Sequence, residues 1–352
     1  MSKKIIFIVV VAGVIASYFL YRNTTSSKTP IIPIVFKNAH EPVPTAFVHP
    51  LSIEEMRKQN YETEPITIEE TLANKSGYKQ FIASYMSDGN KIQGLLTVPI
   101  SDDSNEKFPV IIFNHGYIPP EQYRTTEKYV AYVDYFARNG YIVFKSDYRG
   151  HGDSEGNPEG AYYSTAYTRD VLHAVNAVKQ YPQADADRIG MWGHSMGGHI
   201  TLRSMVTTGD IKAGVIWGGV VASYGDMMNN WRRRQPWRPS SSESAARRPT
   251  RDELIKEFGA PDSASPFWRS ISPIYFVKDI SGPVQIHHGL ADDVVPWEFS
   301  ESLSKALEAE KKAVEYYTYP GGDHNLSGAD FGPAIKRSLD FFDAHVKNKA
   351  RS

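Results

Sequence analysis

A serine flanked by glycines is the feature that most constrains the fold of this chain. Gly193, Ser195 and Gly197 lie between an apolar run at 188–192 and a helical pattern at 199–206. A serine at the apex of a strand–turn–helix segment adopts strained backbone angles, and the residues two before and two after it crowd together. A larger side chain than glycine would clash there. The pattern therefore predicts a buried strand, a sharp turn that exposes the Ser195 hydroxyl, and a helix.

A nucleophilic serine needs a base that takes its proton and an acid that holds the base. On sheets with such a turn, the acid and then the histidine follow the serine along the chain. The segment 283–288 reads as a buried strand that leads to a loop with Asp292 at its tip, and 314–319 reads as a strand that leads to His324. Both side chains are therefore expected at the edge of a parallel sheet where ligands bind.

A fourth component lies upstream of the serine. The apolar run 108–114 leads into Gly116 and Tyr117. The glycine allows the chain to turn so that a backbone N–H faces the substrate oxygen. We assign the oxyanion hole to the N–H groups of Tyr117 and Met196. Losing one such donor typically costs about 2.7–4 kcal/mol of transition-state stabilisation.

Other residues compete for the acid and base roles. Asp293 is the closest rival of Asp292. His287 and His288 are the rivals of His324, but their position inside a strand favours a role in the core or on a sheet face. The strand position of the two rival histidines favours His324 as the base, whereas Asp292 and Asp293 both stay open as the acid at this point.

Three further polar residues near these motifs are expected to have supporting roles. Asp147 and Arg149 are predicted to form an ion pair that braces a loop near the oxyanion strand, and His194 to flank the serine turn without titrating. No metal-ligand spacing, phosphate-binding glycine loop or dinucleotide fingerprint stands out in the sequence. Neither a metal nor a cofactor is therefore expected.

Together these pieces resemble the α/β-hydrolase superfamily, and more closely the catalytic domain of prolyl oligopeptidase-like (S9) and dienelactone-hydrolase-like enzymes. The resemblance implies an α/β fold with a mostly parallel, doubly wound sheet and antiparallel N-terminal strands. It also implies an acid at Asp292, through the pattern G-x-x-D-x-x-V-P, and a base at His324. The matching segments cover roughly residues 50–346 in order: 84–89, 114–116, 147–154, the Ser195 turn, 265–268, the Asp292 loop and the His324 turn.

The expected activity is the hydrolysis of carboxylic esters through an acyl-enzyme intermediate. Peptidases of this group usually carry a long β-propeller before the hydrolase domain. About 90 residues precede the first hydrolase strand here, too few for four blades of about 40–50 residues each. This shortfall favours an ester over a peptide as the substrate.

Three alternatives to a simple esterase stay open. The first is a serine peptidase of the acylaminoacyl or dipeptidyl type. The second is a cutinase-like polyester hydrolase, which the pairing of Met196 with Tyr117 resembles. The third is a binding protein on a catalytically inactive hydrolase fold.

The rest of the chain reads as strands and then alternating strands and helices. A capping box at 52–55 predicts a short helix. Strands are expected at 66–72, 80–85 and 91–98 as the antiparallel start of the sheet, and then at 109–114, 141–146, 187–193, 213–218, 283–288 and 314–319. Helices are expected at 125–138, 160–180, 196–208, 297–310 and 332–347.

One connection is longer than the others. Residues 224–267 exceed an ordinary loop and are predicted to form a small cap over the active site, with a helix near 252–258. Trp231 and Trp237 in this cap are candidates for substrate contact, because an exposed cap needs an apolar reason to keep two tryptophans. The arginines of this segment are expected to be solvated.

The N-terminal region predicts a location outside the cytoplasm. Lys3 and Lys4 precede an uncharged run at 5–21, which is just long enough to span a bilayer. Residues 1–22 are therefore expected to form a membrane anchor with the enzyme on the outer side, or else a cleaved secretory signal. Segment 23–50 reads as a linker, and 51–349 as the hydrolase domain with its cap.

The composition limits partners and chemistry. The net charge of −1 provides no overall field for nucleic acid, so a small-molecule or polymeric ester is the expected partner. The chain has no cysteine, which excludes disulfides, thiol catalysis and a lipidated N-terminal cysteine. The sequence makes no prediction about the oligomeric state.

Overall fold

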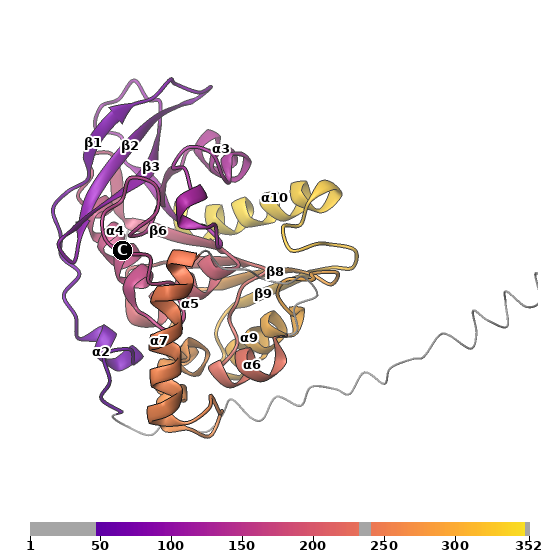
Figure 1. Ribbon diagram of the computed structural model, residues 1–352. Helices are drawn as coiled ribbons and strands as arrows, with labels where there is room; N and C mark the ends of the chain where they lie inside the picture. Colours follow the sequence, from indigo (N-terminus) through magenta and orange to yellow (C-terminus); the bar gives the residue numbers. More distant parts are fainter. Residues whose placement is uncertain (1–46, 232–240, 349–352) are drawn as a thin grey trace, which may run out of the picture. The chain divides into compact units, whose positions relative to one another are not determined.

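The fold is built around one sheet that contains both antiparallel and parallel strands. A computed structural model of the 352-residue chain describes residues 47–231 and 241–348 (Figure 1). Its nine-stranded sheet has the order β1-β2-β3-β5-β4-β6-β7-β8-β9. The strands are β1 (Thr67–Thr71), β2 (Tyr78–Ser87), β3 (Asn90–Pro99), β4 (Phe108–Asn114), β5 (Ile142–Ser146), β6 (Ala184–His194), β7 (Ala213–Trp217), β8 (Val284–Gly289) and β9 (Val314–Tyr319).

The pairing of the strands confirms the predicted α/β fold class. Strands β1, β2, β3 and β5 pair antiparallel, whereas β5, β4, β6, β7, β8 and β9 pair parallel. The carboxyl ends of the parallel strands therefore lie along one edge of the sheet, where the segments predicted to carry the chemistry begin.

Helices cover both faces of the sheet. The helices are α2 (Ile53–Arg57), α3 (Val130–Arg138), α4 (Ala166–Lys179), α5 (Met196–Thr207), α6 (Tyr224–Asn230), α7 (Ser241–Phe258), α8 (Pro266–Ile271), α9 (Trp297–Ala309) and α10 (Phe331–Phe342), which a π-helical turn at Asp343–Lys347 extends. Helices α3 and α10 contact each other and pack on one face, and α4, α5 and α9 pack on the other (Figure 1).

The central strands are apolar throughout because both of their faces are buried. In β4, Val110 and Ile112 belong to the core beneath α4 and α5, whereas Ile111 and Phe113 belong to the core beneath α3 and α10. All four side chains are fully buried. Successive side chains of a strand point to opposite faces, so a strand covered on both sides is an unbroken apolar run.

Two helices begin later than predicted. The predicted helix 125–138 starts at Val130, because Tyr129 before it has a left-handed φ of 62°. The predicted helix 160–180 starts at Ala166; Gly160 has a φ of 82°, and residues 161–165 after it are not helical. The segment after Gly160 is held by Arg203 instead, which donates hydrogen bonds to the backbone oxygens of residues 161 and 164.

The predicted ion pair between Asp147 and Arg149 is wrong. Tyr148 between them has a φ of 59°, and the two side chains have different partners. Asp147 accepts a hydrogen bond from the Tyr123 hydroxyl at 2.9 Å, and burial raises the pKa of Asp147 to about 6. Arg149 binds the buried carboxylate of Asp170 at 2.7 Å. Both residues brace loops, but separately.

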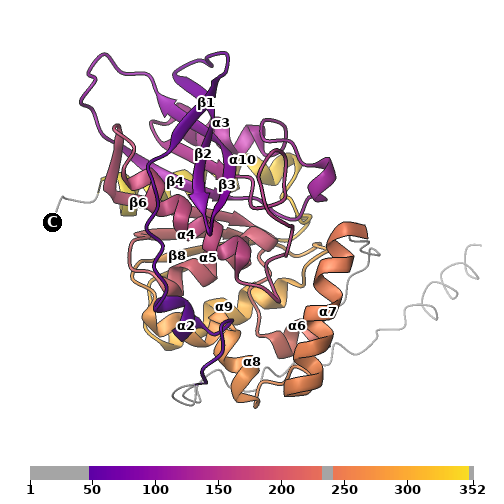
Figure 2. The same cartoon turned by 60° about the vertical axis from the view of Figure 1, so that its left-hand side comes forward.

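Helices α6, α7 and α8 lie between β7 and β8 in the chain, where the cap was predicted. They lie together in Figure 2, and share a small apolar core of Tyr224, Leu254, Phe267, Trp268 and Ile271. Residues 232–240, which include Trp237, lie outside the described residues. These three helices are called the insertion below.

The predicted anchor at 1–22 and most of the predicted linker also lie outside the described residues. At the start of the described chain, Ser52 caps α2 by accepting a hydrogen bond from the backbone N–H of Glu55, as the capping box predicts. Across residues 47–231 and 241–348, no helix is long and apolar enough to cross a membrane.

Candidate active site

Ser195 lies at a strained turn between β6 and α5. Its backbone angles are φ 54° and ψ −116°, which a non-glycine residue rarely adopts. The Ser195 N–H donates to the backbone oxygen of Trp217 at 2.9 Å and ties the turn to β7. A Cβ on Gly193 would lie 2.3 Å from the backbone oxygen of Gly197. The predicted crowding of these two glycines is thus confirmed.

This crowding predicts that Gly197→Ala destabilises the fold. A Cβ at position 197 would lie 2.0 Å from the backbone oxygen of Asn114, and neither backbone can move without shifting β4 or α5. We expect the free energy of unfolding to fall by about 3 kcal/mol, as measured by urea denaturation. Gly209→Ala is the control, because its added Cβ would meet no atom within 4 Å. Equal stability of the two variants would contradict the prediction.

Asp292 and His324 form a hydrogen-bonded pair. His324 Nδ1 lies 2.7 Å from Asp292 Oδ2, and the Asp292 side chain is fully buried. Its other oxygen, Oδ1, accepts the N–H groups of Val294 and Val295 at 2.8 and 2.9 Å. Burial alone would raise the pKa of Asp292, but hydrogen bonds from His288 and His324 outweigh it and hold the pKa well below the ordinary value. The carboxylate is therefore ionised at neutral pH.

His288 is a site residue that sequence reasoning missed. Its Nε2 lies 3.0 Å from Asp292 Oδ2 and 3.1 Å from the backbone oxygen of Val295, both of which only accept. Nε2 therefore carries a proton, and Nδ1 lies 2.6 Å from the Ser300 hydroxyl. Because His288 lies in a strand, the sequence suggested a role in the core. It stands, however, at the carboxyl end of β8, just before the loop that carries Asp292. That position next to the predicted acid is the sequence signal that could have identified His288 as a site residue.

The residues of the two predicted oxyanion donors, Met196 and Tyr117, border the same cavity as Ser195. Met196 is the first residue of α5, where N–H groups have no partner inside the helix and the helix dipole is positive. Tyr117 follows β4 and borders the same cavity as Ser195. A Cβ on Gly116 would lie 3.3 Å from the Ser195 Cβ and 2.7 Å from the Tyr129 hydroxyl. Glycine thus allows this loop to approach the serine.

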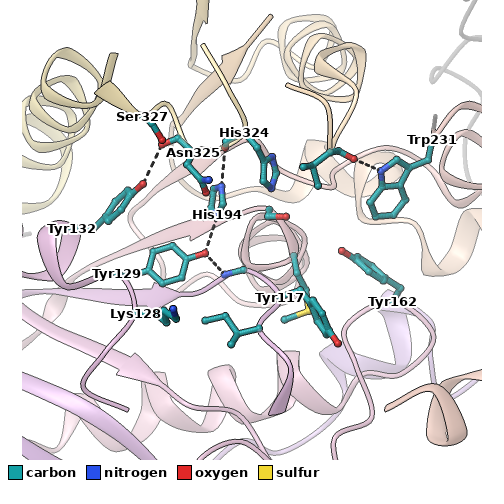
Figure 3. Close-up of a pocket in the computed structure, with 15 residues that line it drawn as sticks. Tyr117, Lys128, Tyr129, Tyr132, Tyr162, His194, Trp231, His324, Asn325 and Ser327 are labelled. Carbon is teal, nitrogen blue, oxygen red and sulfur yellow. Dashed lines mark hydrogen bonds between the residues drawn. The ribbon is translucent and has the colours of Figure 1, made fainter. Parts of the chain in front are cut away.

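One cavity of about 500 Å³ joins these residues (Figure 3). Ser195 and His324 both border it, with no hydrogen bond between them in the described structure. Such contacts are often long without substrate and tighten when it binds. The aromatic residues of the lining are Tyr117, Tyr129, Tyr132, Tyr162 and Trp231.

Trp231, a predicted substrate contact, stands in the wall of this cavity at the end of α6. Its indole Nε1 donates to the backbone oxygen of Val294 at 2.8 Å, as Figure 3 shows. Its ring meets Tyr162 edge-on, with centroids 5.9 Å apart. The insertion therefore contributes an aromatic face beside the loop that holds Asp292.

A comparison with known protein families identifies the family of this chain. Residues 128–349 match the prolyl oligopeptidase family, which is more than half of the sequence. The chain belongs to the prolyl oligopeptidase family. The chain is also similar to the uncharacterized peptidase YtmA of Bacillus subtilis, with 27% identity over 246 residues, which covers 68% of this chain and 84% of YtmA.

Two solved structures share the α/β-hydrolase fold of this family member. Acetyl xylan esterase 1 from Thermoanaerobacterium sp. has a TM-score of 0.59 and 17% identity, over 82% of this chain and 90% of the esterase. The acylaminoacyl peptidase of Pyrococcus horikoshii also has a TM-score of 0.59, with 23% identity, over 78% of this chain and 43% of the peptidase. The family and the fold together make this protein a serine hydrolase.

Proposed function

We propose that the protein hydrolyses carboxylic esters with Ser195 as the nucleophile, His324 as the base and Asp292 as the acid that orients it. The observation that carries the proposal is the 2.7 Å bond from His324 Nδ1 to a buried carboxylate, at the same cavity as a serine held on a strained turn. The bond to Asp292 keeps the proton on Nδ1, so Nε2 can accept the serine proton.

The reaction follows from these positions. Ser195 Oγ attacks the acyl carbon while its proton passes to His324 Nε2, and the carbonyl oxygen becomes an oxyanion bound by the N–H groups of Met196 and Tyr117. The carbon–oxygen bond to the alcohol then breaks, and His324 returns the proton to the leaving alkoxide. His324 next takes a proton from water, whose oxygen attacks the acyl carbon. The bond from that carbon to Ser195 Oγ then breaks, His324 returns the proton to Oγ, and the carboxylic acid is released.

The cavity lining supports an ester rather than a peptide with a free amino terminus. A substrate ammonium group needs a carboxylate partner when it leaves water. No aspartate or glutamate of the described ranges borders the cavity, whereas five aromatic rings and Lys128 do. Aromatic faces suit a neutral, flat acyl or alcohol group. The likeness to acetyl xylan esterase 1 over 90% of that chain also supports an ester.

The test compares ester and amide substrates on one enzyme preparation. We expect turnover of p-nitrophenyl acetate, butyrate and benzoate, with the highest kcat/KM for benzoate because of the aromatic lining. Aminoacyl-naphthylamides with a free amino terminus are expected to react far more slowly. Faster amide than ester turnover would indicate a peptidase, and a wild-type enzyme that a fluorophosphonate does not label would indicate an inactive fold.

A further inference from the structure

We infer that Tyr129 and His194 form a hydrogen-bond relay that positions both the base loop and the oxyanion loop. The inference rests on the proposed function, because it assigns positioning roles around Ser195 and His324. Figure 3 shows the two bonds that Tyr129 makes, to His194 and to the backbone nitrogen of Gly116.

The chemistry of His194 determines the direction of each bond. Its Nε2 lies 2.9 Å from the backbone oxygen of His324, which can only accept, so Nε2 carries a proton. Burial, with the nearby His324 ring, lowers the pKa of His194 to about 3, so the imidazole is neutral at working pH. A neutral ring has one N–H, and Nδ1 must therefore accept. Its donor is the Tyr129 hydroxyl at 2.7 Å.

The same hydroxyl holds the oxyanion loop. Its oxygen accepts the backbone N–H of Gly116 at 2.9 Å. Gly116 immediately precedes Tyr117, whose N–H is the proposed oxyanion donor. Tyr129 itself stands at the N-cap of α3 with a left-handed φ of 62°. A tyrosine adopts this conformation only where surrounding contacts hold it.

The relay therefore runs in one direction, from the Gly116 N–H through Tyr129 and His194 to the His324 carbonyl. It fixes His324 at its main chain, while Asp292 fixes its side chain at 2.7 Å. The His194 and His324 rings lie 4.6 Å apart between centroids. His194 also directly precedes Ser195 in the chain, so the hydrogen bonds that reach the base and the oxyanion loop start beside the nucleophile. His194 and Tyr129 are positioning residues in this account, since they act through His324 and Gly116.

Three variants separate the links of the relay. Tyr129→Phe keeps the ring and removes both bonds of the hydroxyl. His194→Gln keeps an N–H donor near the position of Nε2, whereas His194→Asn keeps only an acceptor near the position of Nδ1. Tyr135→Phe is the matched control, because it removes a hydroxyl from the same helix α3 at a residue outside the cavity lining.

We expect kcat for an ester to fall about 10- to 100-fold in Tyr129→Phe and His194→Asn with KM within about twofold, because small misplacements of reacting groups cost rate rather than affinity. His194→Gln is expected to retain more activity than His194→Asn, and Tyr135→Phe to match the wild type. Urea denaturation checks that each variant is folded. If His194→Asn fails to fold, kcat of Tyr129→Phe alone tests the relay.

A second readout needs no substrate. The His324 Nδ1 proton in its bond to Asp292 should give a far-downfield proton NMR signal, which we expect to shift in Tyr129→Phe and His194→Asn and to stay in Tyr135→Phe. Folded Tyr129→Phe and His194→Asn with kcat within twofold of wild type and an unmoved signal would overturn the relay, even in an active esterase. A wild type that turns over no ester would instead overturn the proposed function, and the NMR signal would still test the relay.

Discussion

Replacing Ser195 with alanine is expected to lower kcat for ester hydrolysis by at least about 10⁴-fold. Without the hydroxyl no acyl-enzyme forms, and only direct attack by water remains. The His324–Asp292 pair and the oxyanion donors stay in place, so a small residual rate above that in water should persist. Initial rates with p-nitrophenyl butyrate measure the loss, and fluorophosphonate labelling of the same samples should fall to background.

Ser204→Ala is the matched control for this variant. Ser204 lies on the same helix α5, is fully buried, and its hydroxyl has no hydrogen-bond partner among the described residues. Its removal should leave turnover, labelling and folding close to those of the wild type. A Ser195→Ala enzyme that still labelled, or that kept more than about a hundredth of wild-type kcat, would show that another group is the nucleophile.

The central strands of the sheet could be predicted because the residues that each strand buries are neighbours in the sequence. Val110 to Phe113 form an unbroken apolar run, and both faces of β4 are covered. The starts of α3 and α4 were not predictable, because the helical patterns continue beyond the points where the chain turns. A positive φ at Tyr129 precedes α3, and the Tyr129 hydroxyl bonds to the distant His194. The segment before α4 is held by hydrogen bonds from the distant Arg203.

The chemistry of the site divides in the same way. Ser195, Asp292 and His324 each follow the end of a predicted strand, so topology alone places them at one edge of the sheet. The residues that hold these three in position are brought together only by contacts between distant parts of the chain. Tyr129 is 65 residues from His194, and His194 is 130 residues from His324, so no local pattern joins them.

Asp292→Asn is expected to lower kcat by about 10³- to 10⁴-fold. Both oxygens of the carboxylate accept hydrogen bonds: Oδ2 from His288 and His324, and Oδ1 from two backbone N–H groups. Whichever way an asparagine amide turns, its NH₂ group faces a donor. This clash between two donors is relieved when the proton of His324 moves from Nδ1 to Nε2. That tautomer cannot accept the serine proton at Nε2. Rates with p-nitrophenyl butyrate and the downfield NMR signal of His324 measure the two effects.

Asp293→Asn is the matched control, since it makes the same change one residue away, at the rival acid. It should keep near wild-type kcat, and a larger loss in Asp293→Asn than in Asp292→Asn would reverse the assignment of the acid.

The pH dependence of stability gives a second check on Asp292. Because the folded state holds the pKa of Asp292 below its unfolded value of about 3.9, this residue stabilises the fold above that pH and less as the pH falls further. The stability gap between wild type and Asp292→Asn in urea should therefore be wider at pH 7 than at pH 3, and a gap that widened on acidification would contradict an ionised Asp292.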